Sequence, residues 1–436
     1  MMKKRLTALI MASILVFGLG VNAALADGDT AKPVAQGELN TAVAAVDAEA
    51  ATEGEEEAEA PAEPDAEGTL SFANLESRIR ENNYNVLALE RKIANIDATN
   101  LDSVRQDLID GLNQIADAQW GMITSSSAAS AALSGNPGLA MMGSASAASM
   151  QSTYDDLRQQ LDNIKSGKTA RDLENMRRQL TAGEDQLIMG MESAYIQLKA
   201  FEEQDAALTR GIAALDRGAQ TAQISYEHGL VSQLTLDQLA AQRVQLVSKQ
   251  STLRMGIEVG KLNLKAMVGE DLGASLTLTA LPSVTAKQLD AMDLEGDLAR
   301  AKETSVDLFN ANATLADARQ EYQDSNSGNT ARRTWEAAQF TYEAAQQDFE
   351  LSFRTLYAQV KDYAQKVDAA KSALALDEKN YAVSALKCQQ GTISQNALAD
   401  AADTLASAKD TVSGAERDLL SAYRNYYWAV EHGILN

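Results

Sequence analysis

The sequence is poor in the residues that build covalent or metal-bound sites. It has one cysteine, Cys388, so no disulfide can form within the chain. Its only histidines, His228 and His432, make no convincing transition-metal site together with that cysteine. No pairing of a nucleophile with a base stands out either. We therefore expect no catalytic residues, no metal site and no cofactor, so the chain is not expected to be an enzyme.

Proline and aromatic residues are also scarce. Five prolines occur in 436 residues, and none lies between Pro137 and Pro282 or after Pro282. Over these two stretches nothing imposes the helix break that proline causes. Aromatic residues make up 5% of the chain, whereas apolar residues as a whole make up 45%. This composition favours long packed helices over a β-rich core.

Positive charge is in deficit throughout. Lysine and arginine number 38 against 61 acidic residues, which gives a net charge of −23. A chain this acidic lacks the basic surface that nucleic acid or an anionic lipid would need. Partners of those two kinds are therefore disfavoured.

The N-terminus has the three parts of a secretory signal peptide. A basic start, a short apolar run and small residues before Ala26 occupy residues 1–26. The apolar run is short for a membrane span, which favours cleavage over a retained anchor. Cleavage would remove three basic residues and take the net charge from −23 to −26. Residues 27–68 that follow are an acidic Ala/Glu/Pro linker, expected to be disordered. A calcium-buffering or partner-docking tail is the alternative for it.

From Thr69 onward the chain is predicted to be helical almost throughout. The clearest seam has apolar residues spaced alternately by four and three positions, as in a coiled coil: Leu356, Val360, Tyr363, Val367, Ala370 and Leu374. We expect one long helix over about Ala331–Gln390 and a counterpart over about Ser152–His228. Helices of this length do not fit a compact globule and require a coiled coil or a barrel of helices.

Two segments interrupt this pattern. Residues 275–281, before Pro282, alternate apolar and polar residues and predict one short strand. Residues 118–154 carry no charge and are rich in Ser, Ala, Gly and Met. Their composition leaves short helices, weak strands and a flexible loop open as alternatives.

The chain contains an internal duplication. Residues 195, 197, 199 and 201 match residues 357, 359, 361 and 363 at an offset of 162, and the same offset places Gly229 on Gly391 and Ser232 on Ser394. A register that holds over more than forty residues indicates two repeats. An earlier pair of similar segments begins at Arg78 and Arg300, at an offset of 222, so the first repeat is 60 residues longer. We assign residues 69–283 to the first repeat, with residues 118–154 as an insertion, and residues 284–436 to the second.

Each repeat contains a glycine followed three residues later by a serine within a long helical pattern. Glycine can adopt a positive φ and end a helix, and serine can cap the helix that follows. The segments Gly229–Ser232 and Gly391–Ser394 are therefore predicted to be tight turns between antiparallel helices.

These features together resemble the TolC-type outer-membrane efflux proteins. The resemblance covers roughly residues 69–436. It rests on the signal peptide, the duplication, the opening LSFANLESRIRENNYNVLALERKIANIDA, the turns GLVSQLTLDQLAAQRVQL and GTISQNALADAADTLASA, and the closing AERDLLSAYRNYYWAV. It implies a mainly all-α fold, an α-barrel protomer of long antiparallel coiled-coil helices, with at most the one short strand.

The resemblance also implies a function and partners. It implies a homotrimer whose helical tunnel passes small molecules or proteins out of the cell and docks on a periplasmic adaptor and an inner-membrane pump. The docking tips would be Gly229, Leu230, Val231, Ser232, Gly391, Thr392, Ile393 and Ser394. Acidic residues near the tips narrow the tunnel in that family, and the candidates are Asp237, Asp400 and Asp403. Ordinary solvated helix charges are the favoured alternative for each of these three.

The chain departs from the family where barrel strands would lie. Leu308–Gln339 is charged and helix-forming, and residues 118–154 contain few β-branched or aromatic residues. We therefore expect the membrane barrel to be missing or rudimentary, which leaves membrane contact open. The expected location is the outer membrane or periplasm, or the cell envelope where no outer membrane exists. The alternative function is a non-conducting coiled-coil scaffold or spacer of the cell envelope.

Overall fold

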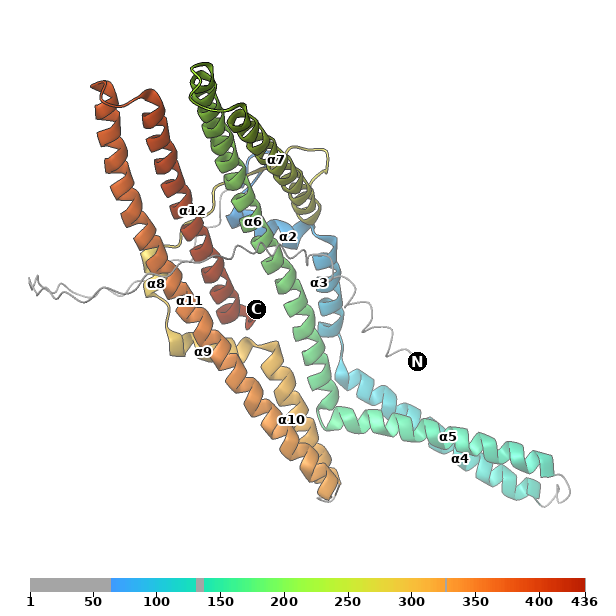
Figure 1. Ribbon diagram of the computed structural model, residues 1–436. Coiled ribbons are helices and arrows are strands. Elements are labelled where there is room, and N and C mark those ends of the chain that lie inside the picture. Colours follow the sequence, from blue (N-terminus) through green and yellow to red (C-terminus); the bar gives the residue numbers. More distant parts are fainter. Residues whose placement is uncertain (1–63, 131–136, 326–327, 436) are drawn as a thin grey trace, which may run out of the picture. The chain divides into compact units, whose positions relative to one another are not determined.

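A computed structural model describes residues 64–130, 137–325 and 328–435 of the chain (Figure 1). The predicted signal peptide and nearly all of the acidic linker lie outside the described residues. The described part is helical almost throughout, which confirms the predicted fold class. No helix in that part is both long and apolar enough to cross a bilayer.

The helices differ greatly in length. In chain order they are α2 (Phe72–Asn82), α3 (Tyr84–Asp97), α4 (Leu101–Ser130), α5 (Pro137–Lys165), α6 (Lys168–Glu227), α7 (Gln233–Met267), α8 (Ala286–Asp290), α9 (Leu294–Thr304), α10 (Val306–Asp324), α11 (Asn329–Gln389) and α12 (Gln395–His432). The two strands are β1 (Thr69–Leu70) and β2 (Thr277–Leu278).

The long helix of the second repeat was predicted to within two residues at each end. It was expected over 331–390 and is α11, with 61 residues, which corresponds to roughly 90 Å. The predicted start of the counterpart helix in the first repeat was wrong, because α6 begins at Lys168 and not near Ser152. Gly167, at φ 74°, separates α5 from α6 there. The break falls where the repeat offset of 162 places the start of α11.

The surplus of the first repeat is a helical hairpin. α4 and α5 pack on each other, and Gln119 Nε2 donates to Gln151 Oε1 across the pair at 3.4 Å. The described residues of the uncharged 118–154 segment are helical, which decides between the alternatives left open by composition. Leu308–Gln339 is likewise mostly helical, with residues 308–324 in α10 and 329–339 in α11; residues 326–327 between them lie outside the description.

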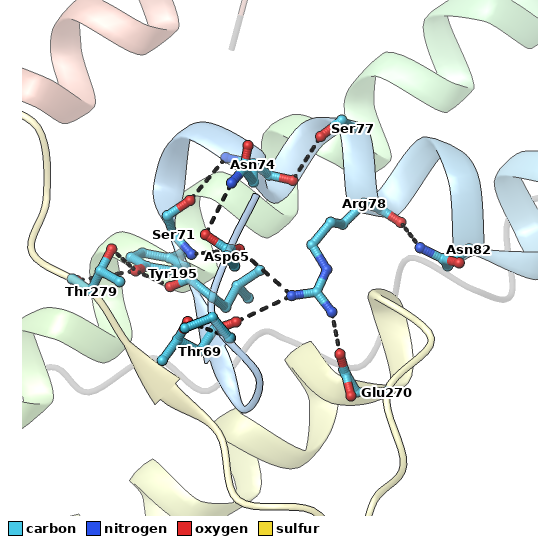
Figure 2. Close-up of polar contacts among 12 residues, drawn as sticks. Asp65, Thr69, Ser71, Asn74, Ser77, Arg78, Asn82, Tyr195, Glu270 and Thr279 are labelled. Atoms are coloured by element: carbon cyan, nitrogen blue, oxygen red, sulfur yellow. Dashed lines mark hydrogen bonds and ion pairs between the residues drawn. The ribbon is translucent and has the colours of Figure 1, made fainter. Parts of the chain in front are cut away.

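One short strand was predicted, and residues 64–130, 137–325 and 328–435 contain two. β2 lies within the predicted 275–281 segment and pairs in parallel with β1, which the sequence analysis missed. Tyr195 on α6 is fully buried beneath this pair. Its hydroxyl lies 2.8 Å from the Leu70 carbonyl oxygen and 3.1 Å from the Thr279 carbonyl oxygen (Figure 2). A strand of two residues is too short to show an alternating pattern in the sequence. β1 is therefore recognised only from its pairing with β2.

Each predicted repeat has a break between two short consecutive helices. Asn83 separates α2 from α3, and Ser305 separates α9 from α10, at the predicted offset of 222. Each side chain caps the helix that follows: Asn83 Oδ1 accepts from the backbone N–H of Val86 at 3.3 Å, and Ser305 Oγ from that of Leu308 at 3.3 Å. The breaks therefore lie at corresponding positions of the two predicted repeats.

Near the end of each predicted repeat, a glycine packs closely against the break between the two short helices of that repeat. Gly269 follows α7 and Gly433 follows α12, both at positive φ. A β-carbon on Gly433 would lie 2.3 Å from the backbone nitrogen of Ser305, and one on Gly269 would lie 2.7 Å from Cβ of Asn82. Only glycine fits both the backbone angle and the close approach.

Two apolar cores form, one mainly from each repeat. The first gathers side chains from β1, β2, α2 and α6, and the second gathers them from α9, α11 and α12. α12 contributes to both, with Leu420 and Trp428 in the first core and Leu419 and Tyr426 in the second. This helix joins the two repeats along their length.

Candidate docking tips

The two predicted tips have the same backbone geometry. α6 ends at Glu227 and α7 begins at Gln233, whereas α11 ends at Gln389 and α12 begins at Gln395, so the offset of 162 holds at all four helix ends. Gly229 has φ 70° and Gly391 has φ 71°. These glycines let the chain reverse within five residues in each repeat.

At each tip, an equivalent backbone hydrogen bond spans the glycine and ends the helix. The backbone N–H of Leu230 donates to the Ser225 carbonyl at 2.8 Å, and that of Thr392 donates to the Lys387 carbonyl at 2.9 Å. Such a bond across six residues satisfies carbonyl groups that a helix end would otherwise leave unpaired. Both tips are therefore ordered turns in which a carbonyl group at the helix end is hydrogen-bonded.

The two capping serines differ. Ser394 Oγ accepts from the backbone N–H of Ala397 at 3.1 Å, as predicted for an N-cap. Ser232 occupies the N-cap position of α7 but accepts no backbone N–H. Its hydroxyl lies 3.3 Å from Thr235 Oγ1 instead. The predicted N-cap hydrogen bond is therefore present at the second tip. At the first tip Ser232 occupies the N-cap position without accepting that bond.

The tips expose apolar surface. Leu230 is 77% exposed and Leu234 is 64% exposed at the first tip, and Leu386 is 57% exposed just before the second. Val231 and Ile393, at matching positions, are half-buried. A β-carbon on either tip glycine would meet no atom within 4 Å. The eight predicted tip residues therefore lie in two open turns of like shape.

The helices of the two repeats are joined side by side below the tips. α6 packs on α12, and a series of ion pairs crosses between them. The pairs are Glu192–Arg424, Glu203–Arg417, Arg210–Asp410 and Arg217–Asp403. The partners on α12 are spaced by seven residues, as in an antiparallel coiled coil. We call these four pairs the α6–α12 ladder.

The sign of the ladder reverses along its length. The acids of the two pairs far from the tips lie on α6, whereas the acids of the two pairs nearer the tips lie on α12. Closer still to the tips, Asn396 Nδ2 donates to Thr221 Oγ1 at 3.2 Å. The two hairpins are thus linked in one register almost to their ends.

The three acids predicted near the tips lie in two places. Asp403 pairs with Arg217, and Asp400 lies 3.8 Å from the same guanidinium, with its side chain 75% exposed. Asp237 lies apart on α7, where it accepts from Gln233 Nε2 at 3.1 Å. The fold therefore brings Asp400 and Asp403 together and leaves Asp237 separate.

A buried polar cluster marks the end of the ladder away from the tips. Trp428 Nε1 donates to Glu192 Oε2 at 2.8 Å beside the pair with Arg424. His432 Nδ1 lies 2.7 Å from Asp185 Oδ2, and Arg80 of α2 contacts both Asp185 and Glu184. Burial raises the pKa of Glu184, while the nearby Arg80 opposes that shift. This cluster joins α2, α6 and α12.

Neither the ladder nor the buried cluster was predicted from the sequence. A usable signal was present, because charged residues recur at seven-residue spacing at 203, 210 and 217 and again at 403, 410 and 417. The signal becomes readable only once the antiparallel register of α6 and α12 is known. Among the described residues, no group of three or more His, Cys, Asp or Glu side chains is arranged to hold a metal ion.

The solved structures to which the chain is similar include an outer membrane protein and two outer membrane channels. VceC of Vibrio cholerae is 11% identical, with a TM-score of 0.41 over 60% of this chain and 74% of that one. CmeC of Campylobacter jejuni is 14% identical, with a TM-score of 0.41 over 65% and 69%. MtrE of Neisseria gonorrhoeae, in its open state, is 14% identical, with a TM-score of 0.38 over 61% and 72%. No protein-family profile and no curated protein sequence matches the chain.

Proposed function

We propose that this chain is one subunit of an exported TolC-like duct. Three copies would form a helical tunnel that docks by its tips on an adaptor, next to an inner-membrane pump, and passes small molecules or proteins outward. The observation that carries the proposal is the order of the long helices. They pack in the succession α11, α12, α6, α7, with both hairpins turning at the same end.

The two outer helices of this succession carry apolar side chains that are exposed in a single chain. On α7 they are Val244, Val247, Met255, Val259 and Leu262. On α11 they are Phe340, Leu351, Leu376, Val383 and Leu386. Met255 is 66% exposed and Leu376 is 60% exposed, so the apolar surface is substantial on both helices. Exposed apolar surface of this extent marks an interaction site.

Pairing of α7 with α11 of the next copy would cover both surfaces. The contact would be heterologous, since one face meets a different face, and a heterologous contact closes into a ring when its rotation permits. The resemblance stated above sets the expected number of copies at three. Residues 230, 231, 392 and 393 would then form a crown at one end of the ring, where the adaptor docks.

The same assembly gives the three tip acids their proposed role. Asp400 and Asp403 would lie near the tunnel's narrow end, with Asp403 held by Arg217 of the same chain. Asp237, on the neighbouring helix hairpin, would add a further negative charge. We propose that these acids make the entrance cation-preferring.

The decisive experiment measures oligomeric state. Met255→Glu with Val259→Glu places two charges on the apolar surface of α7, and Gln242→Glu with Gln245→Glu adds the same charge elsewhere on that helix. Sedimentation should show a trimer for the wild type and the Gln variants and a monomer for the Met255/Val259 variant. A wild-type protein that stays monomeric at micromolar concentration contradicts the duct.

Electron microscopy of the trimer separates the duct from the scaffold alternative. An axial channel along the helices is expected for a duct, whereas a filled three-fold bundle would favour a non-conducting spacer. Tip docking is tested by Leu230→Asp with Thr392→Asp, two exposed positions at which substitution should leave the trimer intact. Unchanged cross-linking from the tips to the adaptor in this variant would argue against docking there.

A further inference from the structure

The end of the α10–α11 hairpin away from the tips contains a polar pocket. Its volume is about 560 Å³, and it is lined by α10, by the start of α11 and by Ser166 at the α5–α6 junction. Because α11 is one unbroken helix, this pocket and the Gly391 turn lie at opposite ends of it. The pocket is thus separate from the proposed docking tips.

An aromatic platform forms one wall. Trp335 of α11 lines the pocket, and its ring stacks on Tyr322 of α10 with 5.4 Å between centroids and an interplanar angle of 11°. The stack fixes the indole, so a ligand that packs on it meets a surface that is already ordered. Leu315 and Ala316 extend this apolar wall.

The remaining wall consists of planar polar side chains. Asn312, Gln323 and Gln339 line the pocket, and their amides make no side-chain hydrogen bond to another residue in the part of the chain that the structure describes. Each amide offers both donors and an acceptor. They are therefore available to a ligand rich in hydroxyl or amide groups.

The charges of the pocket cancel. Arg319 and Asp324 both line it, and neither forms a salt bridge within the described residues. A pocket with one charge of each sign favours a neutral ligand over a nucleotide or other anion. Asp324 is its single carboxylate, whereas glycoside hydrolysis normally uses a pair.

A polar pocket near the N-terminal end of the described residues differs in this respect. The pocket beside Asp65 and Arg78 is lined by side chains that bond to one another (Figure 2). Arg78 contacts Asp65, the Thr69 carbonyl and Glu270, and Asn74 donates to Asp65 at 3.0 Å. The hydrogen-bonding groups of Arg78, Asp65 and Asn74 are thus engaged within the protein, whereas the amides in the Trp335 pocket are not.

We propose that the Trp335 pocket binds a neutral oligosaccharide of pyranose units. The C–H face of one ring packs on Trp335, and the hydroxyl or acetamido groups bond to Asn312, Gln323 and Gln339. The volume accommodates a short stretch of a glycan chain. In an exported protein such a site would hold the far end of the molecule to polysaccharide. The inference stands independently of the duct.

The test uses chitotetraose and maltotetraose as probes against the mature, full-length protein. Ligand-observed NMR should show binding of one or both with a Kd of about 1 mM or tighter. Trp335→Ala should weaken binding by about tenfold or more. Trp120→Ala, which removes an exposed indole on α4, should leave it unchanged. The response to the two probes distinguishes an N-acetylated from a plain glucan ligand.

Further variants keep the test independent of folding and assembly. Gln339→Ala and Asn312→Ala remove one amide each and should weaken binding several-fold, with unchanged helix content by circular dichroism. Binding equal to the wild type in Trp335→Ala overturns the proposal, as does the failure of both saccharides to bind the wild type. If the wild type binds no saccharide and Trp335→Ala no longer forms the trimer, Trp335 belongs to the subunit interface instead.

Discussion

At the scale of single residues, Glu192 has the greatest consequence for the joint between the repeats. Its side chain is only 4% exposed, and it accepts from Arg424 and from Trp428 Nε1 at 2.8 Å. Removing one partner of a buried pair leaves the other charge uncompensated, which costs far more than the loss of a surface pair. The buried cluster thus fixes how α12 lies on α6.

We predict that Glu192→Ala lowers the free energy of unfolding by about 3 kcal/mol. Asp362→Ala is the matched control, because Asp362 pairs with Lys366 at 2.7 Å on the exposed surface of α11. The control should cost less than about 1 kcal/mol. Urea unfolding followed by circular dichroism measures both, and equal losses would show that the Glu192 cluster is not essential.

A pH dependence follows from Asp65. Burial raises the pKa of this carboxyl, but the hydrogen bonds from Ser71 and Asn74, together with the charge of Arg78, outweigh burial and lower it below its usual value. A carboxyl whose pKa is lowered by folding stabilises the fold above its unfolded pKa, about 3.9, and this stability is lost as pH falls through the folded value.

We predict that Asp65→Asn destabilises the protein by about 1–2 kcal/mol at pH 7. The gap between the variant and the wild type should shrink as the pH is lowered from 4 toward 2, because the wild-type carboxyl becomes protonated. Denaturant titrations at several pH values measure this gap. A gap that stays constant with pH would mean that the charge of Asp65 contributes nothing.

At the scale of elements, four of the positive-φ glycines, two from each predicted repeat, fall into two kinds. Gly229 and Gly391 turn in open space, whereas Gly269 and Gly433 pack against the breaks at Asn83 and Ser305. The first kind was found from sequence because it is followed by a serine and lies within a long helical pattern. The second was not, since its constraint comes from a distant backbone.

We predict very different outcomes for alanine at the two kinds of glycine. Gly229→Ala should cost about 1 kcal/mol, the strain of a left-handed residue alone. Gly433→Ala adds a clash with the backbone of Thr304 and Ser305 and should cost about 3 kcal/mol or more. Thermal unfolding of the two variants compares them directly. Similar melting temperatures would mean that the C-terminal residues move aside without cost.

The helix lengths and the register were predictable because they follow from local pattern. In the predicted seam, Val360 and Val367 are buried in α11 and Leu356 is half-buried, as the spacing requires. The start of α6 was misplaced because residues 152–165 are also helix-forming, and the break depends on Gly167 alone. The pairing of α6 with α12 was out of reach, since nothing local specifies which surface helix faces which.

At the scale of the whole molecule, the single cysteine offers a direct test of assembly. Cys388 is half-buried in the last turn of α11, close to the second tip. A spin label there would place one probe per subunit at the same end of the proposed ring. We predict one dominant distance between labels in dipolar spectroscopy, as three-fold symmetry requires, which disappears in the Met255→Glu/Val259→Glu variant. A broad distribution in the wild type would contradict a closed ring.

The α6–α12 ladder also sets how such a protein can change size. Because each α12 partner lies seven residues from the next, inserting one residue into α6 would turn its charges away from α12 by about 100°. A longer or shorter relative would therefore differ by whole heptads. The change must also occur together in α6, α7, α11 and α12 if the two tips are to stay level. The length of this protein can therefore change only in steps of one heptad, taken together by four helices.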